Sequence, residues 1–305
     1  MPTVTEIQRR TLAILEARVD QVALLPAIVA QLSELDLNSE DAAEKIESLA
    51  RSDPPLALRL MRLANEGEPG NGNIATLRDA IVQVGTKRLS GMIFALSVVK
   101  VFVANTEAQR NLWVHSIQTA LAARRFAEMH SDLGIDVEEA FLAGLLHDIG
   151  RFMIFEHRPQ DMAQIDEAKV ADPRDLVAAE VRVCGFDHAT LGYIVCERLH
   201  IPFTVCEMVR THHFYRDQRR QIAPEVGSLV RLVQEADCLS FGLLKHRSGP
   251  TRLEVARDDW MDQTLRLGAR TEVALSPEQW VKEIQRIDND ARMAASLIDI
   301  AYSDA

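Results

Sequence analysis

The chain has 305 residues, of which 47% are hydrophobic, so it can bury a large core as one large domain or two smaller ones. Its formal net charge of -11 argues against a general binder of nucleic acid or of anionic membranes, because phosphate groups are held chiefly by lysine and arginine. The sequence shows no CxxC pair, signal peptide or bilayer-length apolar run, and this predicts a cytoplasmic protein with reduced thiols and no membrane contact.

The first third of the chain reads as a succession of helices. Capping residues and acids mark their starts, because both satisfy the free backbone N–H groups of a first helical turn. These signals predict helices over residues 5–20, 25–35, 40–50, 54–66, 77–84 and 87–102. Gly85 joins the last two, a geometry that also suits a helix-turn-helix, but the second helix is apolar almost all round. Ordinary packing is therefore favoured over DNA recognition.

Polar residues 104–109 separate this part from a second helical half. The stretch 138–152 is an apolar helical run that ends in the adjacent His147 and Asp148. Apolar residues at helical spacing predict further helices over 111–130, 172–183, 189–199, 203–213, 226–245 and 280–302. Nothing in the chain alternates with the period of a strand, so the sequence predicts an all-α fold.

Histidines and aspartates that could bind metal lie at helix ends or on apolar helices of the second half. They are His115, His147, Asp148, His188, His212, His213 and Asp237. Imidazole with carboxylate suits a divalent transition metal, iron or manganese before zinc or nickel, and one carboxylate can bridge two ions. The plainer alternative is that each histidine is a hydrogen-bonded core residue and that Asp148 lies exposed after a helix end.

Five separated motifs give the sequence a family resemblance. They read LLPAIVAQL from Leu24, SDPPLALRLMRLAN from Ser52, DAIVQVG from Asp79, GLLHDIG from Gly144 and FDHATLGYIVCERLHIP from Phe186. In this order they resemble the HDOD domain, the "HD-related output domain" of bacterial signalling proteins, within the HD superfamily of metal-dependent phosphohydrolases. The resemblance covers residues 17–213, with Asp237 as a looser match.

The resemblance implies a domain over residues 17–245, followed by a C-terminal helical extension over 246–305. Within the domain, an N-terminal helical subdomain over 17–105 would pack on a metal-binding HD-type core over 106–245. One ion would be held by His115, His147, Asp148 and Asp237, and a second, bridged by Asp148, would be held by His188 with His212 or His213.

Two basic features have alternative interpretations. Arg151 takes the place of a lysine in the family's catalytic branch and could contact a phosphate, or it could be a solvent-facing arginine after a helix end. The short clusters at 124–125 and 216–220 are interpreted as solvated faces rather than binding sites, although the second follows His213 directly.

The resemblance predicts a regulatory output module with a retained dinuclear metal site, which binds a signalling protein or a nucleotide. The alternative is a phosphohydrolase in which metal-activated water attacks a phosphoester, but no general acid can be named. Hydrolysis of cyclic di-GMP is disfavoured, because HHFYRDQRRQ from His212 lacks the acid and the GYP motif of the catalytic branch. Oxygen chemistry at a di-iron centre is a third option. The C-terminal extension could cover the core or form a homodimer face.

Overall fold

The computed structural model describes residues 39, 41–51, 76–85, 102, 104–167, 173–199, 201–269 and 275–297. Contacts divide the chain into one unit over Leu24–Val103 and another that contains Ala104–Ala305. Every element that the structure describes is a helix, which confirms the predicted all-α class. No helix in these ranges is both long and apolar enough to span a bilayer.

In the smaller unit, α3 (Ala42–Arg51) packs on α5 (Leu77–Val84). Thr76 caps α5 by accepting a hydrogen bond from the Asp79 N–H, and Gly85 ends the helix at a φ of 89°, as the sequence predicts. The helices predicted over 5–20, 25–35, 54–66 and 87–102 lie outside the described residues, as do the motifs that begin at Leu24 and Ser52. The helix-turn-helix alternative therefore stays untested.

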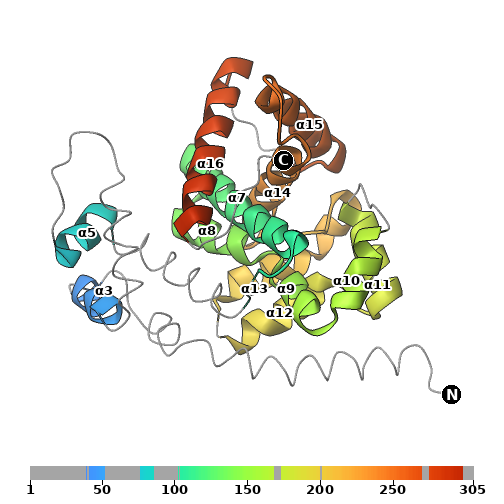
Figure 1. Cartoon of the computed structure of the whole chain (residues 1–305), viewed down its shortest axis with the longest axis horizontal. Helices are drawn as coiled ribbons and strands as arrows, with labels where there is room; N and C mark the ends of the chain where they lie inside the picture. Colours follow the sequence, from blue (N-terminus) through green and yellow to red (C-terminus); the bar gives the residue numbers. More distant parts are fainter. Residues whose placement is uncertain are drawn as a thin grey trace. The chain divides into compact units, whose positions relative to one another are not determined.

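The larger unit is built around α7 (Glu107–Met129), which packs on α8 (Val137–Leu146) and on α14 (Gly227–Lys245) (Figure 1). Thr106 and Gln109 form a capping box at the start of α7, so this helix begins four residues before the predicted position 111. The short helix η1 (Ser131–Leu133) links α7 to α8.

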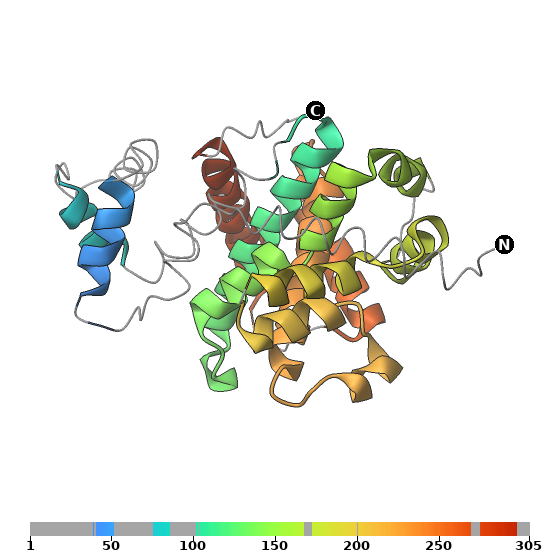
Figure 2. The ribbon, with the colours of Figure 1, turned by 90° about the horizontal axis from the view of Figure 1, so that it is seen from below.

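The helical run over 138–152 ends at His147 and Asp148 as predicted, and α9 (Ile149–His157) begins directly after them. The sequence missed α10 (Pro159–Glu167), which leads through α11 (Pro173–Cys184) to α12 (His188–Arg198) and α13 (Phe203–Thr211). Packing of α12 on α9 and of α13 on α8 places these yellow helices across the green ones (Figure 2).

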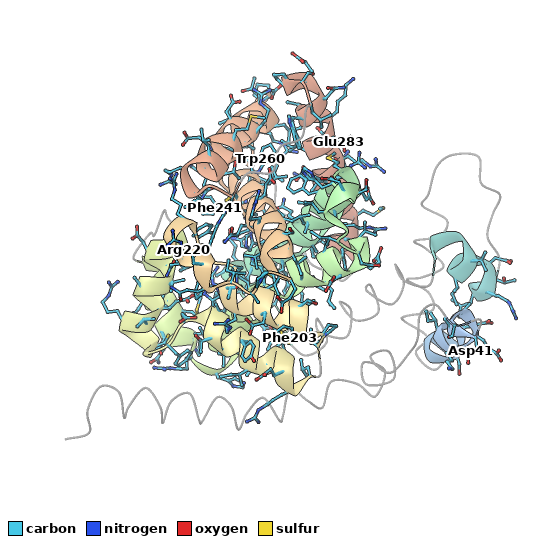
Figure 3. The ribbon with its side chains drawn as sticks, turned by 180° about the vertical axis from the view of Figure 1, so that it is seen from behind. Asp41, Phe203, Arg220, Phe241, Trp260 and Glu283 are labelled. Carbon is cyan, nitrogen blue, oxygen red and sulfur yellow. The ribbon has the colours of Figure 1, made fainter. Side chains whose placement is uncertain are left out.

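The C-terminal helices complete the core. After η2 (Arg216–Gln221) and α14, helices α15 (Arg252–Leu267) and α16 (Pro277–Leu297) pack against α14 and α7, respectively. Trp260 of α15 lies 5.9 Å from Phe126 of α7 and 4.8 Å from Trp280 of α16, measured between ring centroids (Figure 3). All three rings are buried, so the C-terminal helices are part of the hydrophobic core of this unit.

Candidate metal centre

Helix ends and two buried helices bring the predicted metal ligands together. His147 ends α8, Asp148 precedes α9, His188 begins α12, and His212 with His213 follows α13. His115 comes from α7 and Asp237 from α14, and none of the predicted ligands is more than 9% exposed. The plainer interpretation of Asp148 as an exposed helix-end residue is therefore wrong.

The two glycines of the GLLHDIG motif permit this convergence. A Cβ atom at Gly144 would lie 2.8 Å from the Ala120 Cα atom, so the glycine lets α8 approach α7 closely. A Cβ atom at Gly150 would lie 2.0 Å from the His188 carbonyl oxygen, so the second glycine lets α9 approach α12. Because His147 and Asp148 stand between these two contacts, they face His115 on one side and His188 on the other.

The first donor group gathers around Oδ2 of Asp148. The Nε2 atoms of His115 and His147 lie 3.1 Å apart and each is 3.7 Å from this oxygen. Asp237 completes the group from α14, with Oδ1 3.2 Å from His115 Nε2 and 3.9 Å from His147 Nε2.

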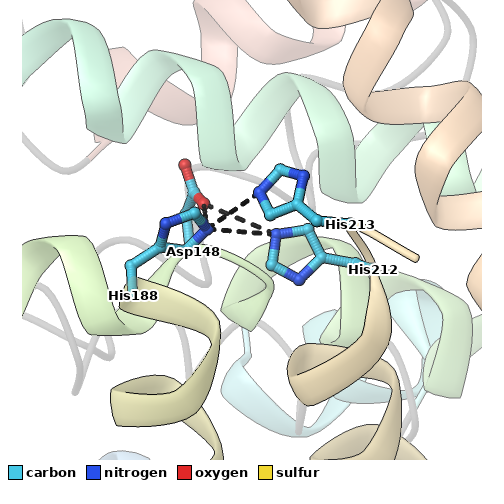
Figure 4. Close-up of side chains that lie close together, drawn as sticks. All are labelled: Asp148, His188, His212 and His213. Carbon is cyan, nitrogen blue, oxygen red and sulfur yellow. Dashed lines mark hydrogen bonds and ion pairs between the residues drawn. The ribbon is translucent and has the colours of Figure 1, made fainter. Parts of the chain in front are cut away.

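The second donor group gathers around the other oxygen of Asp148 (Figure 4). His188 Nε2 lies 3.0 Å from Oδ1, and His212 Nε2 lies 3.8 Å from the same atom. The Nε2 atoms of His212 and His213 are 3.2 Å and 3.0 Å from that of His188. Asp148 thus belongs to both groups. Ligand atoms lie within 4.8 Å of one another among His115, His147 and Asp148, and likewise among Asp148, His188, His212 and His213.

The outer ring nitrogens show which nitrogen of each histidine is free to bind a cation. His147 and His212 place Nδ1 2.7 Å from the carbonyl oxygens of Gly144 and Val209, which can only accept a hydrogen bond. A neutral imidazole that donates from Nδ1 has an unprotonated Nε2. The Nε2 atoms of these two rings lie 3.1 Å from His115 Nε2 and 3.2 Å from His188 Nε2, respectively, so a cation bound there would have several ring nitrogens around it.

His188 has a carboxylate as its outer partner. Glu180 Oε2 lies 2.6 Å from His188 Nδ1 and also accepts a hydrogen bond of 2.9 Å from the His188 backbone N–H. Both side chains are fully buried. A carboxylate that orients a ligand histidine in this way is common behind metal ions, where it raises the basicity of the ring.

The pKa shifts of His147, His212, His213 and Asp148 favour the states that bind a metal, whereas His188 keeps a proton that an incoming ion would have to displace. Burial lowers the pKa of His147, lowers that of His212 to about 3 and holds that of His213 well below its usual value. Burial alone would raise the pKa of Asp148, but His147 and His188 beside it hold that pKa well below its usual range. Burial likewise opposes the charged ring of His188, but Glu180 and Asp148 outweigh it and raise its pKa to about 10.

A cavity of about 510 Å³ opens from this cluster. His115, Asp148, His213 and Asp237 line its inner end. Its other walls carry the cations Arg151, Lys245 and Arg247 and the aromatic rings of Phe155 and Phe241. Arg151 approaches the cluster directly, with Nη1 3.4 Å from Asp148 Oδ2 and a side chain 18% exposed. The expectation of a solvent-facing Arg151 is therefore wrong.

The prediction of solvated faces holds for Arg216 and Arg220, which are exposed, whereas Arg124, Arg125 and Arg219 are half-buried. Four of these five arginines have structural partners. Arg125 forms an ion pair with Glu283 of α16 at 2.7 Å, and Arg124 pairs with Glu138 of α8 at 3.1 Å. Arg216 and Arg219 donate to the carbonyl oxygens of Arg266 and Gly268 at the end of α15. They stabilise a helix C-terminus, where cations are favoured.

The sequence interpretation missed the side chains that form hydrogen bonds with the outer nitrogens of the histidines. Glu180 was not singled out, because an acid on an amphipathic helix is normally solvated, and only its position eight residues before His188 could have drawn attention to it. Ser240, whose Oγ lies 2.9 Å from His115 Nδ1, comes one turn after Asp237 on α14 and was missed as well. Four further histidines match no motif of the family; we expect them at the surface or at helix ends. His130, His157 and His246 lie at helix ends, and His200 is outside the described residues.

Comparison with known protein families gives a match that covers most of the chain. The sequence model of the HDOD domain matches residues 22–215, more than half of the chain. An uncharacterised protein of Treponema pallidum (strain Nichols) is 22% identical over 234 residues, which are 75% of this chain and 45% of that protein. The ribonuclease Y of Mycoplasma capricolum is 27% identical over 122 residues, 40% of this chain and 18% of the enzyme. The chain thus spans less than half the length of these curated relatives.

Solved structures share the fold at low sequence identity. A candidate phosphohydrolase from Shewanella amazonensis SB2B superposes with a TM-score of 0.68 at 22% identity, over 93% of this chain and 97% of the other. An HDOD domain protein of unknown function from Geobacter sulfurreducens superposes with a TM-score of 0.63 at 23% identity, over 89% of this chain and 92% of the other. A candidate signal transduction protein from Marinobacter aquaeolei VT8 superposes with a TM-score of 0.66 at 17% identity, over 96% of this chain and 66% of the other. At these identities the comparison establishes the fold.

Proposed function

Because the chain belongs to the HDOD domain family, we propose that it is a regulatory module that holds two divalent metal ions and uses them to bind a phosphorylated small molecule such as a nucleotide. One observation carries this proposal. The two oxygens of a single buried carboxylate, Asp148, face two separate groups of imidazole Nε2 atoms. That is the donor arrangement of a bridged two-metal site.

The donor chemistry fits the metal class that the family implies. His115, His147, Asp148 and Asp237 would hold one ion, and Asp148, His188, His212 and His213 would hold the other. Mixed nitrogen and carboxylate ligands suit iron or manganese, with zinc and nickel as alternatives, and do not suit magnesium or calcium. Ions held there would supply positive charge to phosphoryl oxygens and would lower the pKa of water.

The cavity walls supply what a phosphorylated ligand needs from the protein. Arg151 reaches the edge of the donor cluster, and a guanidinium can form paired hydrogen bonds with phosphoryl oxygens. Phe155 and Phe241 provide apolar surface at a distance from the ions, where the rest of such a ligand would lie. The expected partners of the module remain a nucleotide or a signalling protein.

Hydrolysis of a phosphoester is the second candidate, and the complete donor set favours it. We prefer ligand binding to hydrolysis because of the residues that line the cavity. Among the described residues of its walls, no carboxylate or histidine lies outside the donor set, and the ammonium of Lys245 is paired with Asp259 at 3.0 Å, so neither a carboxylic acid nor an imidazole is available there to protonate the leaving group. Arg151 could stabilise charge on the phosphoryl group in either case.

Elemental analysis with a phosphate-binding measurement tests the proposal. Wild-type protein should retain about two equivalents of metal, as a two-metal site requires, and should bind inorganic phosphate only when loaded. Asp148→Asn should lose both ions and phosphate binding, whereas Asp161→Asn, which changes a carboxylate paired with Arg158 on α9, should keep both. Folded wild-type protein that takes up no metal would refute the proposal. Release of nitrophenol from a bis-nitrophenyl phosphate by loaded wild type, lost in Asp148→Asn, would establish the second candidate instead.

A further inference from the structure

A chain of buried hydrogen bonds connects His115 to the C-terminal helices. His115 Nδ1 lies 2.9 Å from Ser240 Oγ, which in turn lies 2.9 Å from Gln118 Oε1. The Gln118 amide nitrogen lies 3.4 Å from Asp288 Oδ1 on α16. Of these four residues His115 is the most exposed, at 9%, so the path runs through the interior between α7, α14 and α16.

Two arginines fix the far end of this path. Arg252 of α15 places Nη2 2.5 Å from Asp288 Oδ2, and Arg292 of α16 places Nε 3.1 Å from the same oxygen. A buried carboxylate with two guanidinium partners stays charged and can only accept hydrogen bonds. Gln118 must therefore turn its amide NH2 toward Asp288 and its carbonyl oxygen toward Ser240.

The direction of the remaining bonds follows from the number of protons. Ser240 has one hydroxyl proton, and two oxygens within reach, Gln118 Oε1 and the His115 carbonyl, can only accept it. The Ser240 oxygen is then left to accept the Nδ1–H of His115. That leaves the His115 Nε2 unprotonated, at the atom that faces His147 and Asp237. Each donor in the path thus points toward Asp288, and the result is the tautomer that a metal ligand needs.

His115 differs in this respect from the other histidines whose outer nitrogen has a partner. In His147 and His212 the Nδ1 atom donates to a backbone carbonyl oxygen of the same helical turn, and in His188 the partner of Nδ1 is the carboxylate of Glu180. Ser240, Asp288 and both arginines come after residue 215, where the match to the HDOD family ends. The far end of this support, at Asp288 and the two arginines, therefore lies on α15 and α16, beyond the residues that the family model matches.

We infer that Ser240, Gln118 and Asp288 are positioning residues that hold His115 in its metal-binding tautomer, so that α15 and α16 set the metal affinity of the His115 site. This inference rests on the proposed two-metal function. It assigns a role to the C-terminal helices beyond covering the core, because displacement of Asp288 would release the His115 ring and weaken one of the two sites.

Cobalt(II) titration of metal-free protein, followed by visible absorption and calorimetry, tests the inference. Removing such an outer partner costs about 10- to 100-fold in metal affinity. Ser240→Ala and Gln118→Leu should weaken one of the two binding steps by that factor and leave the step of the His188 site unchanged. Ser116→Ala is the matched control, because Ser116 on α7 is a fully buried serine like Ser240. Its hydroxyl oxygen has no hydrogen-bond partner within the described residues. This variant should change neither step.

The outcomes separate the inference from the proposed function. Wild-type protein that binds no cobalt overturns both. Wild-type protein with two sites whose affinities are the same in folded Ser240→Ala and Gln118→Leu overturns the inference alone. If neither variant folds, nitrogen-15 NMR of the histidine rings in metal-free wild type decides. His115 protonated at Nδ1 alone supports the inference, and His115 protonated at Nε2 overturns it.

Discussion

Gly150 lies directly against the backbone of His188, where a methyl group on its Cα atom would stand 2.0 Å from the His188 carbonyl oxygen. Because the obstacle is backbone, it cannot move aside as a flexible side chain could. Gly150→Ala should therefore force α9 and α12 apart, destabilise the fold by about 1–3 kcal/mol and weaken metal retention. Urea unfolding and metal analysis measure the two effects.

Gly227→Ala provides the comparison for that substitution. An added Cβ at Gly227, the first residue of α14, meets no described atom within 4 Å. Alanine favours helix over glycine, so the free energy of unfolding should be unchanged or slightly raised. A Gly150→Ala protein as stable and as metal-rich as Gly227→Ala would contradict the predicted clash.

Glu180→Gln tests the carboxylate behind His188. The substitution keeps the shape of the side chain but removes the charge that lies 2.6 Å from His188 Nδ1. The ring should become a weaker ligand, and the affinity for one of the two ions should fall by about 10- to 100-fold. Cobalt titration measures this, with Glu207→Gln as control, because Glu207 is a buried carboxylate that pairs with Arg210 instead of a histidine. Equal affinities in the two variants would exclude this role for Glu180.

Arg151→Met separates ligand binding from metal binding. Arg151 lines the cavity and approaches Asp148, yet it supplies no ligand atom to either group. The variant should retain its metal but bind inorganic phosphate about tenfold more weakly, as loss of a charged hydrogen bond predicts. Calorimetry with phosphate measures the change. Arg158→Met removes the arginine at the other end of α9, which pairs with Asp161, and should bind phosphate normally. Unchanged binding in Arg151→Met would rule out the phosphate contact.

Trp260→Ala tests how much the C-terminal helices contribute to the core. Trp260 is fully buried between Phe126 and Trp280, and its Nε1 donates to the Glu235 carbonyl oxygen at 3.1 Å. Its truncation should cost about 3–5 kcal/mol of unfolding free energy. Leu265→Ala on the same helix removes a side chain that is 66% exposed and should cost about 0.5 kcal/mol or less. Similar losses in both variants would show that α15 is not packed as described.

Glu283→Gln gives a stability difference that depends on pH. The hydrogen bonds from Arg125 hold the pKa of Glu283 below its usual 4.5, so the pair stabilises the folded protein above that pH. This contribution is lost as the pH falls through the lowered pKa. The variant should be less stable than wild type by about 1 kcal/mol or less at neutral pH, and equally stable in acid. Urea unfolding of both proteins, and of Arg125→Met, across this range measures the difference. A difference that persists in acid would refute the ion pair as its cause.

Helix type, several helix caps and the set of histidines and aspartates that gather at the helix ends could be predicted from the sequence. The cap at Thr76 and the end at Gly85 depend on atoms within one turn, so local residues determine them. The donors could be identified because family motifs place them in order, although their spacing in the chain is irregular. The structure then groups them as the resemblance implies, with Asp148 between the two groups.

The supporting residues could not be predicted because their roles depend on contacts between distant helices. Gln118 and Asp288 are 170 residues apart and become partners only through the packing of α16 on α7. The hydrogen-bond partners of Arg216 were missed because these carbonyl oxygens, at the end of α15, are about 50 residues further along the chain. Helix α10 was missed because residues 159–167 are mostly polar and its apolar face, Met162 and Ile165, is too short to show a helical period.

The order of the donors along the chain has a consequence for how the protein is made. Proteins are synthesised from the N-terminus and fold as complete units emerge. The His188 group is present once His213 has been added, whereas the first group needs Asp237, and the support of His115 needs Asp288 near the end of α16. A ribosome-bound chain that stops after α13 therefore carries the ligands of one ion only. If the proposed two-metal function holds, the His115 site is the one that cannot form before α14 and α16 have been made.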